Sequence, residues 1–276
     1  MLVVKLGGSN GLALDPALGD IAALVRGGRR VVVVHGGSRE VDRISTALGR
    51  PPRYVTTPSG FQSRYTDRET LEIFAMVVAG RINKLLVERL QALGVNAVGL
   101  CGLDGRLLIG KRKGVIIAVE AGKKKVLRGD YGGTVEEVNA SLLQGLLEGG
   151  YVPVIAPVAI SPEGEALNVD GDRAAAAVAV ALGAEDLVIL SNVPGLLRDP
   201  ADPTSLIPEI PGDALPEYLH RYAKGRMKKK LHAAMAAMEG GVKRVVISHG
   251  AGEAPVSRAL EGAGTVIRGG HCVAGR

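Results

Sequence analysis

The sequence predicts an α/β protein, a three-layer αβα sandwich around a mostly parallel open sheet. Residues 31–34 form a continuous β-branched run, which is typical of a strand buried on both faces. Such apolar runs end in glycine turns and are followed by helical patterns, so strands and helices alternate along the chain. Of the 276 residues, 46% are hydrophobic and 22% are charged, which is enough apolar surface for a large core.

The first 100 residues contain three predicted strands and three predicted helices. The first strand begins at Leu2, and the other two cover residues 31–34 and 95–100. The helices cover about 15–27, 38–48 and 66–91. Asp15 and Pro16 are typical of a helix N-cap and first position, and residues 66–69 (TDRE) are typical of a capping box. Residues 50–65 are rich in proline, threonine and serine, which predicts a loop. The helix at 66–91 has more than one apolar face, which is consistent with packing against another subunit.

The rest of the chain continues the alternation after one β excursion. Turn signals predict a β-meander or hairpin excursion at residues 103–128, and residues 134–137 (TVEE) predict a capping box that opens a helix to Glu148. The later elements are a strand at 151–157, a hairpin at 158–167, a helix at 172–182, a strand at 187–190, helices near 213–222 and after Gly225, a strand at 244–248 and a final helix–strand pair. We expect one domain, with an N-lobe of about 1–170, a C-lobe of about 171–268 and a tail at 269–276.

The net charge of +6 is concentrated in residues 111–128. This segment holds seven Lys or Arg residues against one Glu, whereas the rest of the chain is balanced. A basic patch favours encounter with an acidic partner, and a solvated lysine-rich hairpin is the alternative. The segment lacks interleaved aromatic residues, so no nucleic-acid partner is expected. Its basic residues are Lys111, Arg112, Lys113, Lys123, Lys124, Lys125 and Arg128.

The sequence also argues against secretion and membrane insertion. No run approaches the roughly 18 apolar residues of a membrane-spanning helix, and the N-terminus lacks the pattern of a signal peptide. Cys101 and Cys272 are far apart and form no metal-ligand cluster, which predicts reduced thiols in a cytoplasmic protein.

Two glycine turns follow the first two strands and are candidates for an anion site. Lys5 stands beside Gly7 and Gly8, and residues 35–37 read His-Gly-Gly. Ligands collect at the carboxyl ends of strands in open α/β sheets, where glycine turns expose N–H groups and a lysine adds positive charge. Two ordinary tight turns are the alternative, since neither a P-loop nor a G-x-G-x-x-G motif is present.

Three later stretches carry polar chemistry. Asn168, Asp170 and Asp172 precede the alanine-rich helix, and one carboxylate suffices to cap it, which leaves the other free to pair with lysines. Residues 191–196 (SNVPGL) are as typical of a nucleotide-edge loop as of a plain turn. Gly225 precedes a helix start with several basic residues, which oppose the helix dipole there and so favour an anionic ligand.

These stretches, in this order, resemble the amino acid kinase family, whose members phosphorylate carboxylates and related groups with ATP. The sequences KLGG, HGG, NVDGDRAAA and GRMKKKLHAA match its acetylglutamate kinase branch along nearly the whole chain. The sequences SRYTDR, GLDGR, RGDY and GRMK are similar to the branch that acts on aminoadipate attached to the carrier protein LysW in lysine biosynthesis. The resemblance implies the amino acid kinase fold, ATP with Mg²⁺ held mainly by its phosphates, and a homodimer through the helix at 68–91.

The resemblance also implies a role for each candidate residue. Lys5 and Lys230 would hold the transferring phosphoryl group from opposite sides, and Asp172 would keep them aligned, since this reaction needs positioning and charge neutralisation. Arg64 and Asn168 would grip the acidic part of the substrate. Backbone N–H groups of Gly7, Gly8, Gly36 and Gly37 would bind phosphate and substrate. The residues bordering the nucleotide would be Asn192, Val193, Pro194, Gly195, Leu196, Leu197, Tyr222, Ala223 and Lys224.

The implied function is ATP-dependent phosphorylation of the side-chain carboxylate of LysW-linked α-aminoadipate, with residues 111–128 as the dock for the small acidic carrier. LysW-linked glutamate is a second candidate substrate. Acetylglutamate kinase of arginine biosynthesis is the first alternative, and a non-catalytic amino-acid-binding regulatory module is the second. Ser38 stands where many acetylglutamate kinases have a further glycine. This residue either disfavours acetylglutamate by crowding or simply lets the chain enter its helix.

Overall fold

The structure, a computed structural model, describes residues 1–7, 14–58, 60, 62–120 and 123–269. Within these ranges eight strands form one sheet, in the order β12-β14-β13-β11-β1-β2-β8-β5. They are β1 (Leu2–Leu6), β2 (Val31–His35), β5 (Ala97–Cys101), β8 (Val152–Ala156), β11 (Asp186–Ser191), β12 (Glu209–Pro211), β13 (Arg244–His249) and β14 (Thr265–Arg268). The central strand β1 pairs in parallel with β2 and β11, whereas β14 runs antiparallel to β13. The predicted mostly parallel sheet is confirmed, and it runs without a break from the expected N-lobe into the expected C-lobe.

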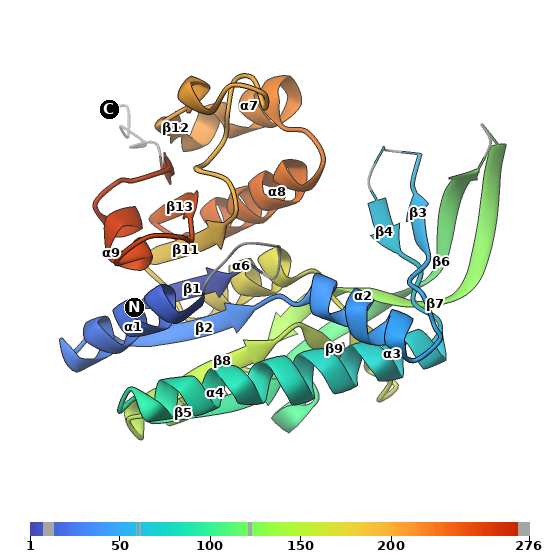
Figure 1. Ribbon diagram of the computed structural model, residues 1–276, viewed down its shortest axis with the longest axis horizontal. Helices are drawn as coiled ribbons and strands as arrows, with labels where there is room; N and C mark the ends of the chain where they lie inside the picture. The colour runs from blue at the N-terminus through green and yellow to red at the C-terminus, as the bar shows by residue number, and fades with distance from the viewer. Residues whose placement is uncertain (8–13, 59, 61, 121–122, 270–276) are drawn as a thin grey trace, which may run out of the picture.

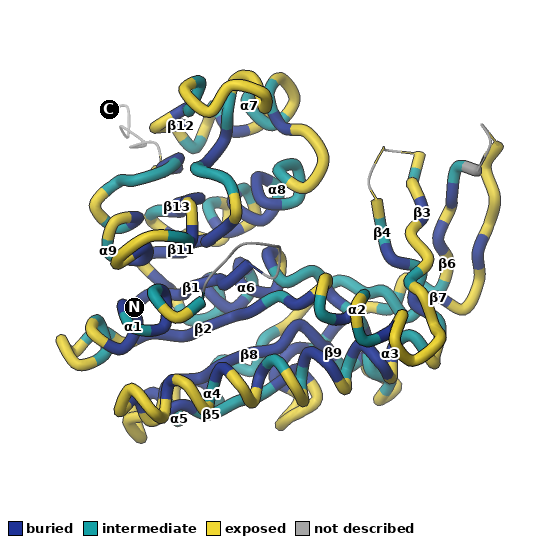
Figure 2. Tube along the Cα trace, in the orientation of Figure 1, coloured by how far each residue is buried: buried dark blue, intermediate teal, exposed yellow. Residues whose placement is uncertain are grey.

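Helices cover both faces of this sheet (Figure 1). One face carries α1 (Leu14–Arg26), α4 (Asn83–Ala92) and α9 (Pro255–Leu260), and the other carries α5 (Ala140–Glu148), α6 (Gly171–Ala181) and α8 (Arg226–Glu239). Successive strand residues point to opposite faces, so Val3 joins the core beneath α6 while Leu2 and Val4 join the core beneath α1. Figure 2 shows these strands as the most deeply buried part of the molecule. The three-layer prediction is confirmed.

A long helical rod lies beside the edge strand β5. It consists of α3 (Arg68–Ala75), a π-helical segment (Met76–Ile82) and α4. The rod begins at Asp67, whose carboxylate accepts a hydrogen bond from the Thr70 N–H at 2.8 Å. The capping box predicted from Thr66 is therefore displaced by one residue, because the Thr66 hydroxyl is bonded elsewhere. The preceding helix, α2 (Ser38–Ala47), packs against α3, and α7 (Leu215–Tyr222) packs against α8.

A long β-ribbon projects from the body of the molecule (Figure 1). It is formed by β6 (Leu108–Glu120) and β7 (Lys123–Val138), and at its base these strands join β9 (Val158–Ile160) and β10 (Ala166–Asn168) in a closed barrel. Beside the ribbon lies a hairpin of β3 (Tyr54–Thr56) and β4 (Gln62–Arg64). Val55 of this hairpin packs against Ile116, Ala118 and Leu127 of the ribbon.

Three sequence predictions in this region need correction or refinement. Residues 50–65 contain the β3–β4 hairpin, not only a loop. Of the meander or hairpin predicted at residues 103–128, the structure shows the hairpin: a short 3-10 turn is followed by the antiparallel pair β6 and β7, and β7 continues to Val138. Residues 134–137 lie in β7, where Thr134 pairs with Lys111, and the helix N-cap is instead Asn139, which accepts from the Leu142 N–H at 3.2 Å. In each case pairing with another strand outweighs the local pattern.

The described residues include no helix that is both long and apolar enough to cross a membrane. Cys101 is a buried free thiol, and burial raises its pKa to about 11, so it is protonated at neutral pH. Cys272 lies outside the described residues, as do residues 270–276 of the predicted tail.

Candidate active site

Lys5, Asp172 and Lys230 meet beside the middle of the sheet. Lys5 is carried by β1, Asp172 by the first turn of α6 and Lys230 by the first turns of α8. The Lys5 Nζ lies 2.7 Å from one carboxylate oxygen of Asp172, and the Lys230 Nζ lies 3.0 Å from the other. All three residues are less than 10% exposed. The structure therefore brings together the three residues predicted to be catalytic.

The charges in this cluster are unequal, because two ammonium groups share one carboxylate. Burial alone would raise the pKa of Asp172, but the ammonium groups of Lys5 and Lys230 outweigh burial and hold this pKa well below its usual value. Burial lowers the pKa of Lys230, and the positive charge of Lys5 lowers it further. The cluster thus has an excess of positive charge, as a site for a phosphoryl group needs.

Asp170 frees Asp172 for this pairing. The Asp170 carboxylate accepts from the backbone N–H groups of Asp172 and Arg173, so Asp170 is the N-cap of α6. Asp170 also lies 3.7 Å from the Lys229 ammonium, with its side chain 30% exposed. Of the two carboxylates that the sequence offered for capping, the structure uses Asp170 and leaves Asp172 to the lysines.

The two glycine turns follow β1, which carries Lys5, and the neighbouring strand β2. The Gly7 N–H donates to the Leu190 carbonyl at 3.1 Å, and the Gly36 N–H donates to the Leu6 carbonyl at 2.9 Å. Both N–H groups therefore extend the sheet ladder, and the expectation that they donate to a ligand is not met in the structure. Gly37 has an extended backbone, and a Cβ there would lie 2.4 Å from the Ile82 Cδ1, so the turn packs directly on the rod. Gly8 lies outside the described residues.

His35 locks the second turn in place. Its Nδ1 lies 2.9 Å from the Gly36 carbonyl, and its Nε2 lies 3.2 Å from the Asn83 amide nitrogen, which also donates to the Val154 carbonyl at 2.8 Å. The side chains of His35 and Asn83 are both buried. Burial lowers the pKa of His35 to about 4, and the Lys5 ammonium adds to this effect. The imidazole is therefore neutral, with its Nδ1–H donating to the Gly36 carbonyl and its Nε2 accepting from the Asn83 amide. Neither contact was visible in the sequence.

The two side chains predicted to grip the substrate, Arg64 and Asn168, each end a short strand, β4 and β10. Arg64, at the end of β4, forms an ion pair with Asp42 at 2.7 Å and donates to the Ser38 carbonyl at 3.1 Å and to the Tyr54 hydroxyl at 3.0 Å. Asn168, at the end of β10, donates to the Thr66 hydroxyl at 3.0 Å. Ser38 is the first residue of α2, so the chain does enter its helix there. Asp42 and Tyr54 have no signal in the sequence beyond that of ordinary surface residues.

A cavity of about 260 Å³ lies between the loop after β11 and the start of α8. Most predicted nucleotide residues line it, namely Asn192, Val193, Gly195, Leu196, Leu197, Tyr222 and Lys224. Ser191, Pro200, Arg226, Met227 and Lys230 complete the lining, while Pro194 and Ala223 do not take part. Because Lys230 also pairs with Asp172, the cavity adjoins the lysine cluster. Its apolar and aromatic walls with a few cationic groups fit a nucleotide.

The loop on one side of this cavity is fixed to β14. The Leu196 N–H donates to the Thr265 hydroxyl at 2.8 Å. A Cβ at Gly195 would lie 2.5 Å from the same hydroxyl, so only glycine allows this close approach. Within the described residues, no three His, Cys, Asp or Glu side chains are grouped as a metal site would need.

The basic residues of the ribbon divide into two groups. Arg112 lies over the Tyr131 ring at 3.6 Å and donates to both carboxylate oxygens of Glu165, at 2.9 and 3.0 Å, so its guanidinium is engaged at the ribbon base. Lys113 lies beside the start of α6. Partial burial lowers the pKa of its ammonium group, and the nearby charge of Arg173 lowers it further. The other predicted docking residues are exposed, namely Lys111, Lys123, Lys124, Lys125 and Arg128.

Comparison with known proteins identifies the family. Residues 1–249 match the model of the Amino acid kinase family. The chain belongs to this family. A curated kinase of Deinococcus radiodurans, named "[LysW]-aminoadipate kinase", is 57% identical over 97% of this chain and 91% of its own length. The protein of the same name from Thermus thermophilus is 54% identical over 97% of this chain and all of its own length. An acetylglutamate kinase of Methanopyrus kandleri is 40% identical over 97% of the chain.

The fold of the amino acid kinase family is also found among solved structures. The N-acetylglutamate synthase of Neisseria gonorrhoeae, solved with coenzyme A and N-acetyl-glutamate, superposes with a TM-score of 0.78 at 29% identity. The match covers 97% of this chain and 59% of the synthase chain, so this chain spans about three fifths of that protein. The predicted amino acid kinase fold is confirmed.

Proposed function

We propose that this amino acid kinase uses ATP to phosphorylate the side-chain carboxylate of LysW-linked α-aminoadipate, which yields an acyl phosphate. The observation that carries the reaction type is the Lys5–Asp172–Lys230 cluster beside the cavity after β11. Phosphoryl transfer needs positioning and charge neutralisation more than covalent catalysis, and two buried ammonium groups supply both. Mg²⁺ would be held mainly by the ATP phosphates and water.

The choice of acceptor is supported by the relatives. The two LysW-dependent kinases are 57% and 54% identical, whereas the acetylglutamate kinase is 40% identical. The carrier link also has a chemical reason, because a free α-amino group could attack the acyl phosphate and cyclise. LysW-linked glutamate is the second candidate acceptor, since a relative from Nitrosopumilus maritimus carries both substrates in its name.

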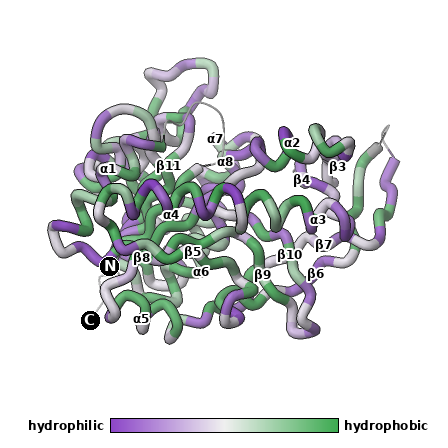
Figure 3. The backbone as a smooth tube through the Cα atoms, turned by 60° about the horizontal axis from the view of Figure 1, so that its bottom comes forward, coloured by the Kyte–Doolittle hydropathy of each residue, from purple (hydrophilic) through white to green (hydrophobic). Residues whose placement is uncertain are grey.

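The outer half of the ribbon is the proposed dock for the acidic carrier. Figure 3 shows the hydrophobic stretch of β6 beside the hydrophilic start of β7. Lys123, Lys124 and Lys125 are exposed there, next to the exposed side chains of Ile117 and Val126. A basic surface with apolar side chains offers an acidic protein both electrostatic steering and contact area.

The decisive experiment compares three acceptors with ATP, namely LysW-linked aminoadipate, LysW-linked glutamate and free acetylglutamate, and traps the acyl phosphate with hydroxylamine. We expect the carrier-linked aminoadipate to be phosphorylated with the highest kcat/KM. Preference for acetylglutamate would identify the arginine-pathway alternative. Full turnover by Lys230→Ala would instead revive the non-catalytic alternative, because a regulatory module needs no phosphoryl clamp.

The carrier dock has its own test. Replacing Lys123, Lys124 and Lys125 with Gln should raise the KM for the carrier-linked substrate and leave the KM for ATP unchanged. A matched control replaces three exposed basic residues away from the ribbon, Arg26, Arg30 and Lys243. An equal effect of the two triple variants, or an equal loss with a carrier-free acceptor, would contradict docking on the ribbon.

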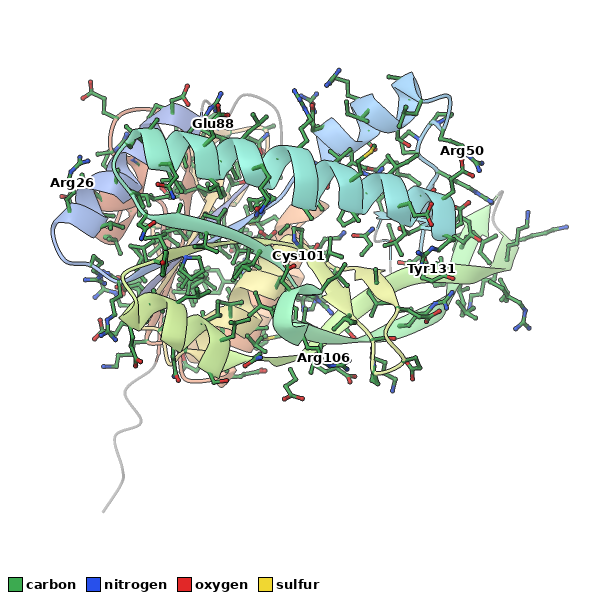
Figure 4. All side chains as sticks on the ribbon, turned by 90° about the horizontal axis from the view of Figure 1, so that it is seen from below. Arg26, Arg50, Glu88, Cys101, Arg106 and Tyr131 are labelled. Atoms are coloured by element: carbon green, nitrogen blue, oxygen red, sulfur yellow. The ribbon has the colours of Figure 1, made fainter. Side chains whose placement is uncertain are left out.

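A homodimer through the helical rod is the proposed assembly. A shallow hollow of about 610 Å³ on the rod is lined by Ile44, Met76, Val77, Arg81, Lys84, Leu85 and Glu88. Met76 is 53% exposed and Leu85 41% exposed, and Glu88 lies on this rod in Figure 4. Sedimentation should show a dimer for the wild-type chain and a monomer for Met76→Glu. The cytoplasmic location stays a prediction.

A further inference from the structure

Thr66 stands between the two proposed substrate residues. It follows Arg64 at the end of β4 and is completely buried. Its hydroxyl accepts a hydrogen bond from the Asn168 amide nitrogen at 3.0 Å and donates to the Arg64 carbonyl at 3.3 Å. Arg64 and Asn168 are about 100 residues apart in the sequence, and this one hydroxyl joins them.

The hydroxyl determines which way the Asn168 amide points. A hydroxyl has one proton to donate, and in Thr66 that proton goes to the Arg64 carbonyl. The oxygen can then only accept from Asn168, which must present its NH₂ group. The carbonyl oxygen of the Asn168 amide is thereby turned away from Thr66 and is left for another partner. Asn168 is partly exposed and lies four residues before Asp172, so its carbonyl oxygen and its second amide N–H remain for the acceptor.

Asp130 holds the backbone of Thr66. This carboxylate is completely buried, and its two oxygens accept from the Thr66 N–H and the Gly132 N–H, both at 3.0 Å. The Thr66 carbonyl accepts in turn from the Tyr131 N–H at 2.7 Å. Thr66 is therefore hydrogen-bonded on both sides of its backbone to β7, at the point where the ribbon leaves the body.

The ribbon base is itself braced at this point. The Arg112 Nε donates to the Asp130 carbonyl at 3.0 Å, and its guanidinium covers the Tyr131 ring. Figure 4 shows Tyr131 where the ribbon passes the beginning of the rod. The contacts thus run from the ribbon through Asp130 and Thr66 to Asn168 and to the backbone of Arg64.

We propose that Thr66 and Asp130 are positioning residues, which orient the Asn168 amide and the Arg64 backbone for the amino-acid acceptor and tie both to the ribbon. This inference rests on the proposed function only in that Asn168 and Arg64 bind the acceptor. It assigns Thr66 no contact with ATP and no part in the Lys5–Asp172–Lys230 cluster. It also accounts for the buried carboxylate of Asp130, which the phosphoryl-transfer chemistry does not use.

The test compares Thr66→Val with Thr66→Ser. Valine has nearly the shape of threonine but no hydroxyl, so the Asn168 amide loses its orientation, while serine keeps the hydroxyl. We expect Thr66→Val to lower kcat/KM for the acceptor about tenfold through KM, the effect of about one lost hydrogen bond, with the KM for ATP unchanged. Thr66→Ser should keep the wild-type kcat/KM for the acceptor. A merely structural role would change the KM values for acceptor and ATP together.

A double variant tests whether Thr66 acts through Asn168. In an Asn168→Ala background the Thr66→Val change should have no further effect on the acceptor KM, because no amide remains to be oriented. Additive effects of the two changes would overturn the proposal, as would an unchanged acceptor KM in Thr66→Val. The measurements use whichever acceptor the wild-type chain phosphorylates. Preference for acetylglutamate over the carrier-linked substrate would therefore refute the proposed acceptor and still test Thr66.

Discussion

Replacing Asp172 with Asn removes the one negative charge that two buried ammonium groups share. Lys5 and Lys230 are 6% and 8% exposed, and their Nζ atoms lie 2.7 and 3.0 Å from the carboxylate oxygens. The substitution keeps the size and shape of the side chain. It therefore changes charge without opening a cavity.

The expected loss of stability follows from these distances. At an effective dielectric constant of about 20, each contact is worth about 6 kcal/mol before desolvation and the repulsion between the lysines are subtracted. Measured losses on removing one partner of a buried ion pair are about 3–5 kcal/mol. We expect the free energy of unfolding to fall by that amount, which corresponds to a decrease in Tm of roughly 6–20 °C for a chain of this size.

Chemical denaturation of the wild-type chain, Asp172→Asn and Asp170→Asn measures this effect. Asp170→Asn is the matched control, since it removes a charge two residues away that is 30% exposed and keeps an asparagine as helix cap. Although burial opposes it, pairing with the lysines lowers the pKa of Asp172 below that of an unfolded aspartate. The wild-type advantage over Asp172→Asn should therefore be complete above a pH of about 4 and shrink as the pH falls further. Equal stability of Asp172→Asn and Asp170→Asn at neutral pH would refute this reasoning.

Lys5→Met leaves Asp172 paired with Lys230, so it should fold and bind a nucleotide analogue in calorimetry yet lose phosphoryl transfer by more than about 100-fold. Wild-type turnover by Lys5→Met would rule out a catalytic role for Lys5. Gly37→Ala brings Cβ to 2.4 Å from the Ile82 Cδ1 and should lower stability by about 1–3 kcal/mol in thermal unfolding. Ile82→Val, which lacks that carbon, should recover most of this loss, although the Val78 Cγ1 at 3.1 Å remains. His35 should titrate near pH 4 in NMR spectra because it is buried, and a midpoint near 6.5 would contradict its contact with Asn83.

Much of the fold could be predicted because its strands are continuous β-branched runs that end in glycine turns. Residues 31–34 and the run after Met1 have no alternative to burial on both faces, and both became central strands. The meeting of Lys5, Asp172 and Lys230 was predicted by family resemblance. Local patterns alone offered Asp170 and Asp172 as equivalent caps, and only the structure separates them.

The errors arose where a distant partner decides the local structure. Thr66 looked like a helix cap, but its hydroxyl bonds Asn168, which is 102 residues away. Thr134 looked like another cap, but it pairs with Lys111 in the ribbon. The N–H groups of Gly7 and Gly36 looked free for a ligand, but each pairs with a carbonyl of the neighbouring strand. A pattern of four residues gives the local preference and contains no information about such partners.

The position of the lysine cluster in the fold explains why its three residues come from such distant parts of the chain. Lys5 lies on the central strand, Asp172 begins a helix that packs on that strand, and Lys230 begins the helix that lines the cavity after β11. One lysine thus comes from the sheet and the other from a helix that covers it, and Asp172 pairs with both. A phosphoryl group that reaches the lysines would compete with Asp172 for the same two ammonium groups. Because the cluster has two positive charges and one negative charge, a net positive charge remains for that anion even while Asp172 stays paired with the lysines.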